Sequence, residues 1–416
     1  RTGVYTCFVE HSGGRDRDDE KERMPLVIGV PGRWKGVEGL KDALKKNNEE
    51  RFVVRGEKLV DTVNDFALLV DVYERNPSLH TTMERLSGGG LGEEDVKAIQ
   101  THTCVVYLVE EDSKKGSVDF ARNTIALTSA VVDAGGLAVL VESAGAAHSA
   151  ETWKHLASFD CVPALYRTLV ATVHGLGRSY TCGMHFFGLP DSTVLGLTAD
   201  NGEFVELLAS INVAGIAGVT HTREKWALGL HEPIYTVTEK EKYIAGYAED
   251  DPKWNPHGVL ELTDPERPLD IATALGMETP DWPEGPVMFN QEGVEEAYQR
   301  AVACAQKNAE QFLALCESPV LQGAAIFKTA IQGKAAFWLL FEGNTETGEW
   351  LGSPFEEVAG LEMGKSIAVP AAFIMDWSWN FCGCVVGSWT SRLARERVAP
   401  EHQRYYDLYT RFLCFA

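Results

Sequence analysis

Four residues in the middle of the chain have side chains that could carry hydrolytic chemistry: Ser143, His148, Cys182 and His185. A hydroxyl or thiol becomes an effective nucleophile when a neighbouring imidazole takes its proton. Cys182 with His148 or His185 would form a thiol–imidazole pair of this kind, and Ser143 is the alternative nucleophile. These residue types point to a thiol- or serine-dependent hydrolase in the central region as one interpretation.

The sequence around these residues does not complete a catalytic motif. Ser143 stands in ESAGA, which lacks the G-x-S-x-G turn that exposes a nucleophilic serine. His185 lies between Met184 and Phe186 in an apolar run that is typical of a strand. A buried histidine whose nitrogens are satisfied by backbone groups is the commoner case, so the hydrolase is kept as an alternative.

A second candidate region is FIMDWSWNFCGC, residues 373–384, which combines Asp376 with Trp377 and Trp379. An ionised carboxylate in an apolar strand is costly unless it is hydrogen-bonded. We therefore expect Asp376 to accept backbone or tryptophan N–H donors at a strand end. Together with Trp350, these aromatic residues are also candidates for a binding surface.

The same region contains the close thiol pair Cys382 and Cys384. Structural zinc sites use four ligands, usually as two closely spaced pairs, and no second pair accompanies this C-x-C. Alternation along a strand would place both thiols on one face, where they pack. We expect neither a metal nor a cofactor.

Composition narrows the classes of partner. The 38 basic and 60 acidic side chains of the 416 residues give a net charge of −22, which repels nucleic acid and anionic membranes. Nine scattered cysteines, an odd number, indicate reduced thiols and an intracellular, cytoplasmic protein. The chain begins at Arg1 instead of Met, which leaves room for a processed leader.

The acidic excess is concentrated in one segment. Residues 239–300 contain fifteen Asp and Glu against five Lys and Arg, and eight of the 17 prolines lie between Pro233 and Pro286. Proline-rich polar segments mark boundaries between folded units. We predict an acidic linker at 233–288, onto which Trp254 and Trp282 could fold back.

Hydrophobic periodicity predicts alternating strands and helices on either side of this segment. The expected fold class is α+β and multidomain, with antiparallel or mixed sheets each covered by helices. Residues 103–111, 137–142 and 165–173 are expected to be strands, and 117–136 and 294–318 helices. The predicted units are a charged arm at 1–24, a small α/β unit at 25–102, a central α+β domain at 103–232, the linker at 233–288 and a C-terminal α+β domain at 289–416.

Two stretches resemble known families. Residues 105 to about 230 resemble the domain-of-unknown-function family 4261 in CVVYLVEE, LAVLVE, GMHFFGLPD and GVTHT. Residues 291 to about 409 resemble family 2314. That resemblance rests on an ordered series: Phe327-Lys328, Phe337-Trp338, the W-x-G-x-P of 350–354, Gly364 and the I-x-D-W of 374–377. Neither resemblance implies an established activity; such domains look common in multidomain bacterial proteins, including some like immunity or toxin-associated modules.

The sequence favours a non-catalytic protein-binding or assembly module of unknown partner. The alternatives are the hydrolase and an immunity-like inhibitor whose acidic surface neutralises a basic toxin. The expected partner is therefore a protein, which would be basic under the last alternative. Neither nucleic acid nor membrane is expected, and the sequence does not fix the oligomeric state.

Overall fold

The structure is a computed structural model of the whole chain. It describes residues 25–47, 50–112, 115–175, 178–195, 202–219, 225–240, 247, 251, 253–280, 295–330, 336–358 and 360–416. The predicted arm at 1–24, Trp282 and most of the GVTHT stretch lie outside these residues. Three sheets and the helices on them make up the described part, which confirms the predicted α+β class with antiparallel and mixed sheets.

The first sheet has seven strands in the order β2-β3-β4-β5-β1-β6-β7, and every pairing in it is antiparallel. Its strands are β1 (Leu26–Gly32), β2 (Phe52–Arg55), β3 (Lys58–Asp61), β4 (Phe66–Glu74), β5 (Cys104–Glu110), β6 (Ala138–Val141) and β7 (Ala146–Ser149). We call it the N-terminal sheet. Strand β5 pairs with both β1 and β4, so the sheet crosses the boundary that the sequence predicts at 102/103.

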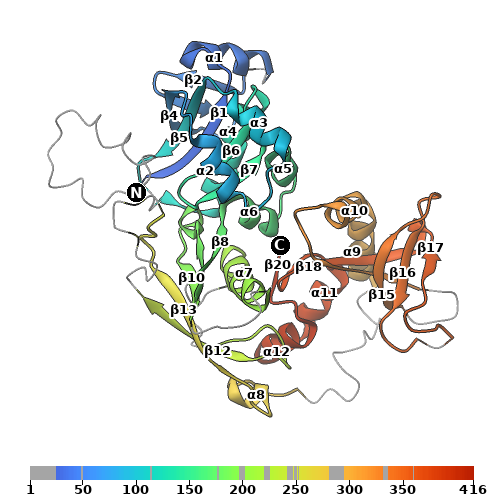
Figure 1. Cartoon of the computed structure of the whole chain (residues 1–416). Coiled ribbons are helices and arrows are strands. Elements are labelled where there is room, and N and C mark those ends of the chain that lie inside the picture. Colours follow the sequence, from blue (N-terminus) through green and yellow to red (C-terminus); the bar gives the residue numbers. More distant parts are fainter. Residues whose placement is uncertain are drawn as a thin grey trace.

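Helices cover both faces of the N-terminal sheet (Figure 1). On one face lie α1 (Gly36–Asn47), α4 (Val118–Asp133) and α5 (Ala150–Ala157), and on the other α2 (Leu79–Leu86) and α3 (Glu93–Gln100). Helix α4 begins as predicted, because Ser117 Oγ accepts the backbone N–H of Phe120 at 3.0 Å. A strand buried on both faces reads as a continuous apolar run, as CVVYLVE of β5 does.

The second, or middle, sheet has six strands in the order β11-β12-β13-β10-β9-β8. They are β8 (Ala171–Gly175), β9 (Arg178–Cys182), β10 (Asp191–Leu195), β11 (Lys225–Trp226), β12 (Ile234–Lys240) and β13 (Val259–Glu266). Strands β10 and β13 are parallel. Helices α6 (Val162–Leu169) and α7 (Gly202–Ile216) pack together, α7 against β9 and β10, and the 3-10 helix η3 (Met184–Phe187) joins β9 to β10.

Two expectations fail in this sheet. Residues 165–173 were expected to form a strand, but most of them belong to α6, which begins at Val162 with Pro163 in its first turn. The acidic segment at 233–288 is not a linker in its described part. It supplies β12, β13 and the short helix α8 (Ile271–Ala274), because the apolar start of β13 pairs with β10 and β12 pairs with β13.

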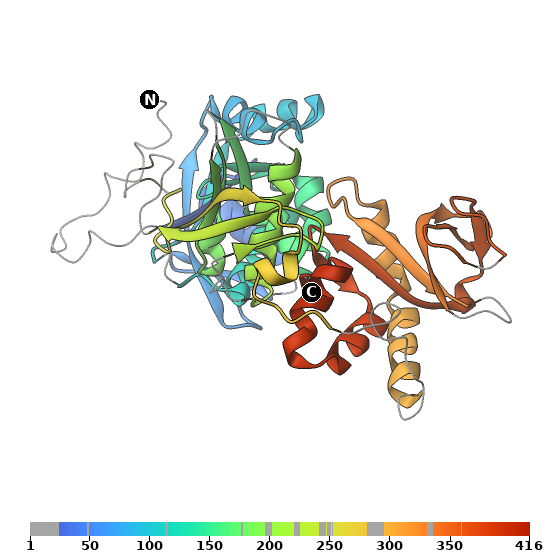
Figure 2. The same ribbon diagram turned by 90° about the horizontal axis from the view of Figure 1, so that it is seen from below.

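The third, or C-terminal, sheet has seven strands in the order β17-β16-β15-β14-β18-β19-β20. They are β14 (Ala324–Thr329), β15 (Phe337–Asn344), β16 (Trp350–Pro354), β17 (Ile367–Val369), β18 (Ile374–Phe381), β19 (Cys384–Gly387) and β20 (Cys414–Phe415). Only β19 and β20 are parallel among the described pairs of this sheet. Figure 2 shows β15 to β17 at the end of the molecule away from the other sheets.

Four helices and one 3-10 turn accompany the C-terminal sheet: α9 (Glu295–Lys307), α10 (Ala309–Glu317), η4 (Ala371–Phe373), α11 (Trp389–Arg397) and α12 (Pro400–Thr410). The sequence predicts one helix over 294–318, whereas α9 ends at Lys307 and α10 begins at Ala309. One continuous group of buried apolar residues runs from the N-terminal sheet to the C-terminal sheet. No helix in the described part of the chain is long and apolar enough to cross a bilayer.

Candidate functional site

The predicted nucleophile Ser143 is a structural residue. Its side chain is fully buried, and its Oγ accepts the backbone N–H of Val27 at 2.9 Å and donates to the carbonyl of Pro25 at 3.4 Å. These bonds fasten the start of β1 to the end of β6. A hydroxyl held in this way has no path to a substrate.

His148 and Cys182 belong to different sheets. His148 on β7 has its Nε2 3.0 Å from the carbonyl oxygen of Thr168, and its ring lies 5.9 Å from that of Trp153. Burial lowers the pKa of His148 to about 4, so the imidazole is neutral at pH 7. Cys182, at the end of β9, is fully buried in an apolar group with Val259.

His185 is buried in η3, where its ring stacks on Phe186 with centroids 5.5 Å apart. Neither ring nitrogen has a hydrogen-bond partner in the described part of the chain. Burial, with a smaller contribution from His257, lowers the pKa of His185 to about 3. The expectation that backbone groups satisfy a buried histidine here is not met within the described residues.

A buried polar junction lies beside these residues, at the ends of β9 and β10. Asp191, fully buried, accepts the backbone N–H of Met184 at 3.2 Å, the side-chain N–H of Asn255 at 2.8 Å and the hydroxyl of Thr181 at 3.4 Å. Burial outweighs these donors and raises the pKa of Asp191 to about 7. The sequence reasoning missed Asn255 because it falls in the segment expected to be a linker.

Glu142, at the end of β6, is the second carboxyl with a raised pKa. Burial raises that pKa to about 7, although Lys253 and a hydrogen bond with Tyr107 oppose the shift. The side chain of Lys253 crosses directly over Gly145, where a Cβ atom would lie 2.9 Å from Lys253 Cε. Gly145 also has a φ of +69°, a left-handed conformation that favours glycine, whereas the flexible Lys253 side chain can move aside.

Asp376 behaves as the sequence predicts. Its Oδ1 accepts the backbone N–H of Trp377 at 2.8 Å and of Trp389 at 3.2 Å. Its Oδ2 accepts both the backbone N–H and the hydroxyl of Thr390, at 2.7 and 2.6 Å. The carboxylate thus caps α11 from β18, and burial raises its pKa to about 6 against these donors and nearby Lys328.

The tryptophans proposed for binding are core residues. Trp350, Trp377 and Trp379 are 2%, 0% and 1% exposed. The indole N–H of Trp377 donates to the carbonyl of Ala305 at 2.9 Å, and Phe312 stacks on Trp350 at 4.8 Å. This correction follows from strand alternation, which turns these indoles toward α9 and α10.

Side chains alternate along each strand, so those on the face of the C-terminal sheet opposite the tryptophans line a cleft. This face presents Ala324 and Ile326 of β14, Leu340 of β15, and Ser378 and Asn380 of β18, which are neighbours in register. The facing wall is formed by α6 and α7, with Tyr166, Arg167, Val205, Glu206 and Ala209. The cleft has a volume of about 750 Å³, and Figure 1 shows α7 beside the strands that lead to the C-terminus. We call it the interdomain cleft.

The interdomain cleft exposes apolar surface. Leu340 is 44% and Phe355 43% exposed, and both line it. Ser378 is buried in the sheet wall of the cleft, and its hydroxyl has no hydrogen-bond partner among the described residues. Unpaired buried hydroxyls are uncommon and call for an explanation.

The cleft continues over the loop between α10 and β14. A second hollow of about 610 Å³ shares Gln322, Gly323, Ala324 and Leu340 with it. Gly323 lies close against β18 in this shared part. A Cβ atom there would lie 2.6 Å from the indole of Trp379 and 2.8 Å from the carbonyl of Asn380. The two hollows adjoin at these residues, and the second is lined further by Leu313 and Cys316 of α10 and by Trp379.

Comparisons with known families, curated proteins and solved structures give no match to this chain. The resemblance to families 4261 and 2314 stays a prediction. Within the described residues, no group of three or more His, Cys, Asp or Glu side chains is placed to hold a metal ion. The function must therefore be argued from the geometry alone.

Proposed function

We propose that the protein is a binding module that takes a segment of a partner protein into the interdomain cleft. The observation that carries this proposal is the exposure of Leu340 and Phe355 inside a concave surface between two units of the chain. Ligand sites in proteins favour such positions, and apolar side chains in a depression supply much of the binding free energy.

The state of the candidate nucleophiles supports binding over hydrolysis. Ser143 is fully buried with its hydroxyl already hydrogen-bonded, and Cys182 is fully buried beside Val259 and Tyr247. A reactive cysteine needs access and an electropositive environment that lowers its pKa. The interdomain cleft, which is an accessible concave surface, lies elsewhere, between α6, α7 and the C-terminal sheet.

A site-specific photo-crosslinker tests this proposal. Benzoylphenylalanine replaces Leu340 in the cleft, and in a matched variant it replaces Phe373, which is 60% exposed on η4. We expect a defined adduct from position 340 and none of that mass from position 373. The partner identified in the adduct, once purified, should bind Leu340→Asp at least about tenfold more weakly than the unaltered protein, while Phe373→Asp binds normally.

Two outcomes would overturn the proposal. One is that positions 340 and 373 give the same adducts, as expected of non-specific collisions. The other is that the purified partner binds Leu340→Asp as tightly as the unaltered chain. Thermal unfolding of both aspartate variants serves as the control for folding, because both replaced side chains are largely exposed.

A further inference from the structure

We infer that the interdomain cleft recognises an extended peptide segment that sets a carboxylate against Arg167 and a large apolar side chain against Leu340 and Phe355. This inference rests on the proposed function and adds the chemistry of recognition to it. It depends on three features: an unpaired cation, an unpaired buried hydroxyl and the length of the concave surface.

Arg167 has unused capacity to bind an anion. It lies in the last turn of α6, is exposed in the cleft, and holds its guanidinium 5.8 Å from the ring centroid of Phe381. It makes no ion pair within the described residues. The other arginine that lines the cleft, Arg411, is paired with Glu232. A guanidinium held over an aromatic ring is pre-organised to bind a carboxylate with two parallel hydrogen bonds.

Glu206 limits how acidic the segment can be. This residue lies on α7, also without an ion pair in the described part of the chain. Burial raises the pKa of the Cys382 thiol to about 12, with a further rise from Glu206 and an opposing effect from Arg167, so both charges lie near this thiol. A second carboxylate beside the first would meet Glu206. The cleft therefore suits a single acidic group with neutral or basic neighbours.

The unpaired hydroxyl of Ser378 suits a peptide backbone. It is buried, lines the cleft and lacks a hydrogen-bond partner among the described residues. A buried hydroxyl without a partner costs the free protein stability. A peptide lying on the floor of the cleft brings an N–H and a carbonyl at every residue, which can recover part of that cost.

The dimensions favour an extended chain. Ile326 is in register with both Leu340 and Ser378, on the strands either side of it. Neighbouring strands lie about 4.8 Å apart, so Leu340 and Ser378 are separated by roughly 10 Å, or about three extended residues. The cleft also reaches from Leu340 on β15 to Arg167 on α6, and the 610 Å³ hollow adjoins it at Leu340. A compact small molecule would leave much of this surface open.

Degenerate peptide libraries test the inference on the full chain. The probe is an N-acetylated, C-amidated pentapeptide mixture with leucine fixed at its third position and aspartate at its fifth, compared with mixtures that carry asparagine or lysine at the fifth position. Peptides retained by the immobilised protein are quantified by mass spectrometry. We expect about tenfold enrichment of the aspartate mixture over the asparagine mixture, since a charge-assisted pair replaces a neutral contact.

Variants of the arginine make the test specific. In Arg167→Gln the ratio of aspartate to asparagine peptides should fall to about one, and in Arg167→Glu the lysine mixture should become the preferred one. Arg55→Gln, an exposed arginine on β2 far from the cleft, should leave the ratio unchanged. Equal retention of all three mixtures by the unaltered protein, or a preference that survives Arg167→Gln, would overturn the inference.

The two levels of the proposal fail in different ways. If crosslinking through position 340 identifies a partner that Leu340→Asp no longer binds, but Arg167→Gln binds that partner normally, the cleft is the binding site and the carboxylate chemistry is wrong. If position 340 gives no specific adduct and the peptide mixtures are not retained, both the function and its recognition chemistry are wrong.

Discussion

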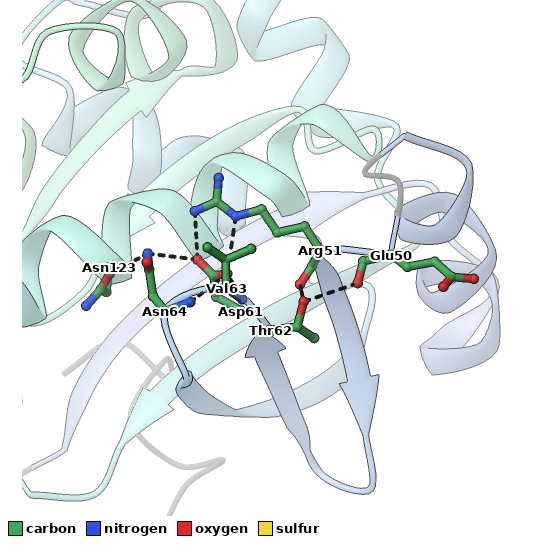
Figure 3. A network of polar contacts seen from close by, with 7 residues as sticks. All are labelled: Glu50, Arg51, Asp61, Thr62, Val63, Asn64 and Asn123. Atoms are coloured by element: carbon green, nitrogen blue, oxygen red, sulfur yellow. Dashed lines mark hydrogen bonds and ion pairs between the residues drawn. The ribbon is translucent and has the colours of Figure 1, made fainter.

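Asp61 in the N-terminal sheet and Asp191 in the middle sheet are both fully buried, yet their carboxyl groups are held in opposite ways. Asp61 accepts two hydrogen bonds from the guanidinium of Arg51, at 2.8 and 3.2 Å, and further bonds from Val63 and Asn64 (Figure 3). Asp191 has neutral donors only among its described hydrogen bonds.

The pKa shifts of the two groups follow from this difference. Burial acts to raise the pKa of Asp61, but Arg51 and the backbone donors outweigh it and the pKa is lowered. For Asp191, burial prevails over the neutral donors and raises the pKa to about 7. Asp61 has a cation beside it and lies close to the surface, where its partner Arg51 is partly exposed, whereas Asp191 lies deep in the protein with neutral donors. Asp376, with four donors and Lys328 farther away, lies between them.

The largest expected effect concerns the pH dependence of stability at Asp191. A folded-state pKa above the unfolded value means that folding takes up a proton. The contribution to the free energy of unfolding is therefore fully present below the unfolded pKa of about 4 and is lost as pH rises toward 7. The slope for one such carboxyl is at most about 1.4 kcal/mol per pH unit.

Chemical denaturation of the unaltered protein and of Asp191→Asn between pH 4.5 and 7.5 measures this slope. His148 and His185, whose pKa values are lowered in the folded protein, act in the opposite direction, losing stability as pH falls below about 6.5. Subtracting the free energy of unfolding of Asp191→Asn from that of the unaltered protein removes the contribution of those histidines. This difference should decrease as pH rises. Asp270→Asn, at an exposed helix cap where asparagine serves equally well, is the control. A difference in free energy of unfolding that does not change with pH would contradict a raised pKa at Asp191.

A smaller effect is expected when the cation is removed from Asp61. Arg51→Gln should lower the free energy of unfolding near pH 7 by about 1–2 kcal/mol, because charge-assisted bonds are lost while the backbone donors remain. The lowered pKa of Asp61 stabilises the folded state above the unfolded pKa, and this stabilisation is lost as pH falls through the folded pKa.

The cost of Arg51→Gln should therefore shrink below about pH 4, which acid titrations of both proteins will show. Arg55→Gln, at the exposed end of β2, which Arg51 directly precedes, should cost almost nothing at any pH. If the two substitutions cost the same, the guanidinium of Arg51 does not stabilise the buried carboxylate, and the contrast with Asp191 needs another explanation.

Local patterns allowed much of the fold to be predicted. The continuous apolar run of β5 and the cap at Ser117 indicated their elements correctly, and the hydrogen-bonded role of Asp376 is confirmed. The strand expected at 165–173 was wrong because α6 is buried nearly all round, which leaves no polar stripe with helical period. An apolar run of that length does not distinguish a strand from a buried helix.

The interdomain cleft could not be predicted, because its walls come from positions as far apart as Arg167 and Leu340. Strand alternation was available in the sequence: it puts Trp377 and Trp379 on one face of β18 and Ser378 on the other. The sequence does not show that α9 and α10 cover the face with the tryptophans. This cover makes the aromatic residues part of the core and leaves the face with Ser378 open.

The smallest expected effect extends the comparison from carboxyls to hydroxyls, using two fully buried serines. Ser143 Oγ accepts the N–H of Val27, whereas Ser378 Oγ has no partner among the described residues. Ser143→Ala should cost about 1–2 kcal/mol, since it leaves a buried N–H unpaired, and Ser378→Ala should be neutral or slightly stabilising. Denaturation curves at pH 7 give both values.

A cost of more than about 1 kcal/mol for Ser378→Ala would mean that its hydroxyl is already hydrogen-bonded in the free protein. The cleft would then lose one of the groups proposed to bind a ligand. A neutral result joined to weaker partner binding would separate the two roles, because the hydroxyl would then contribute only when the cleft is occupied.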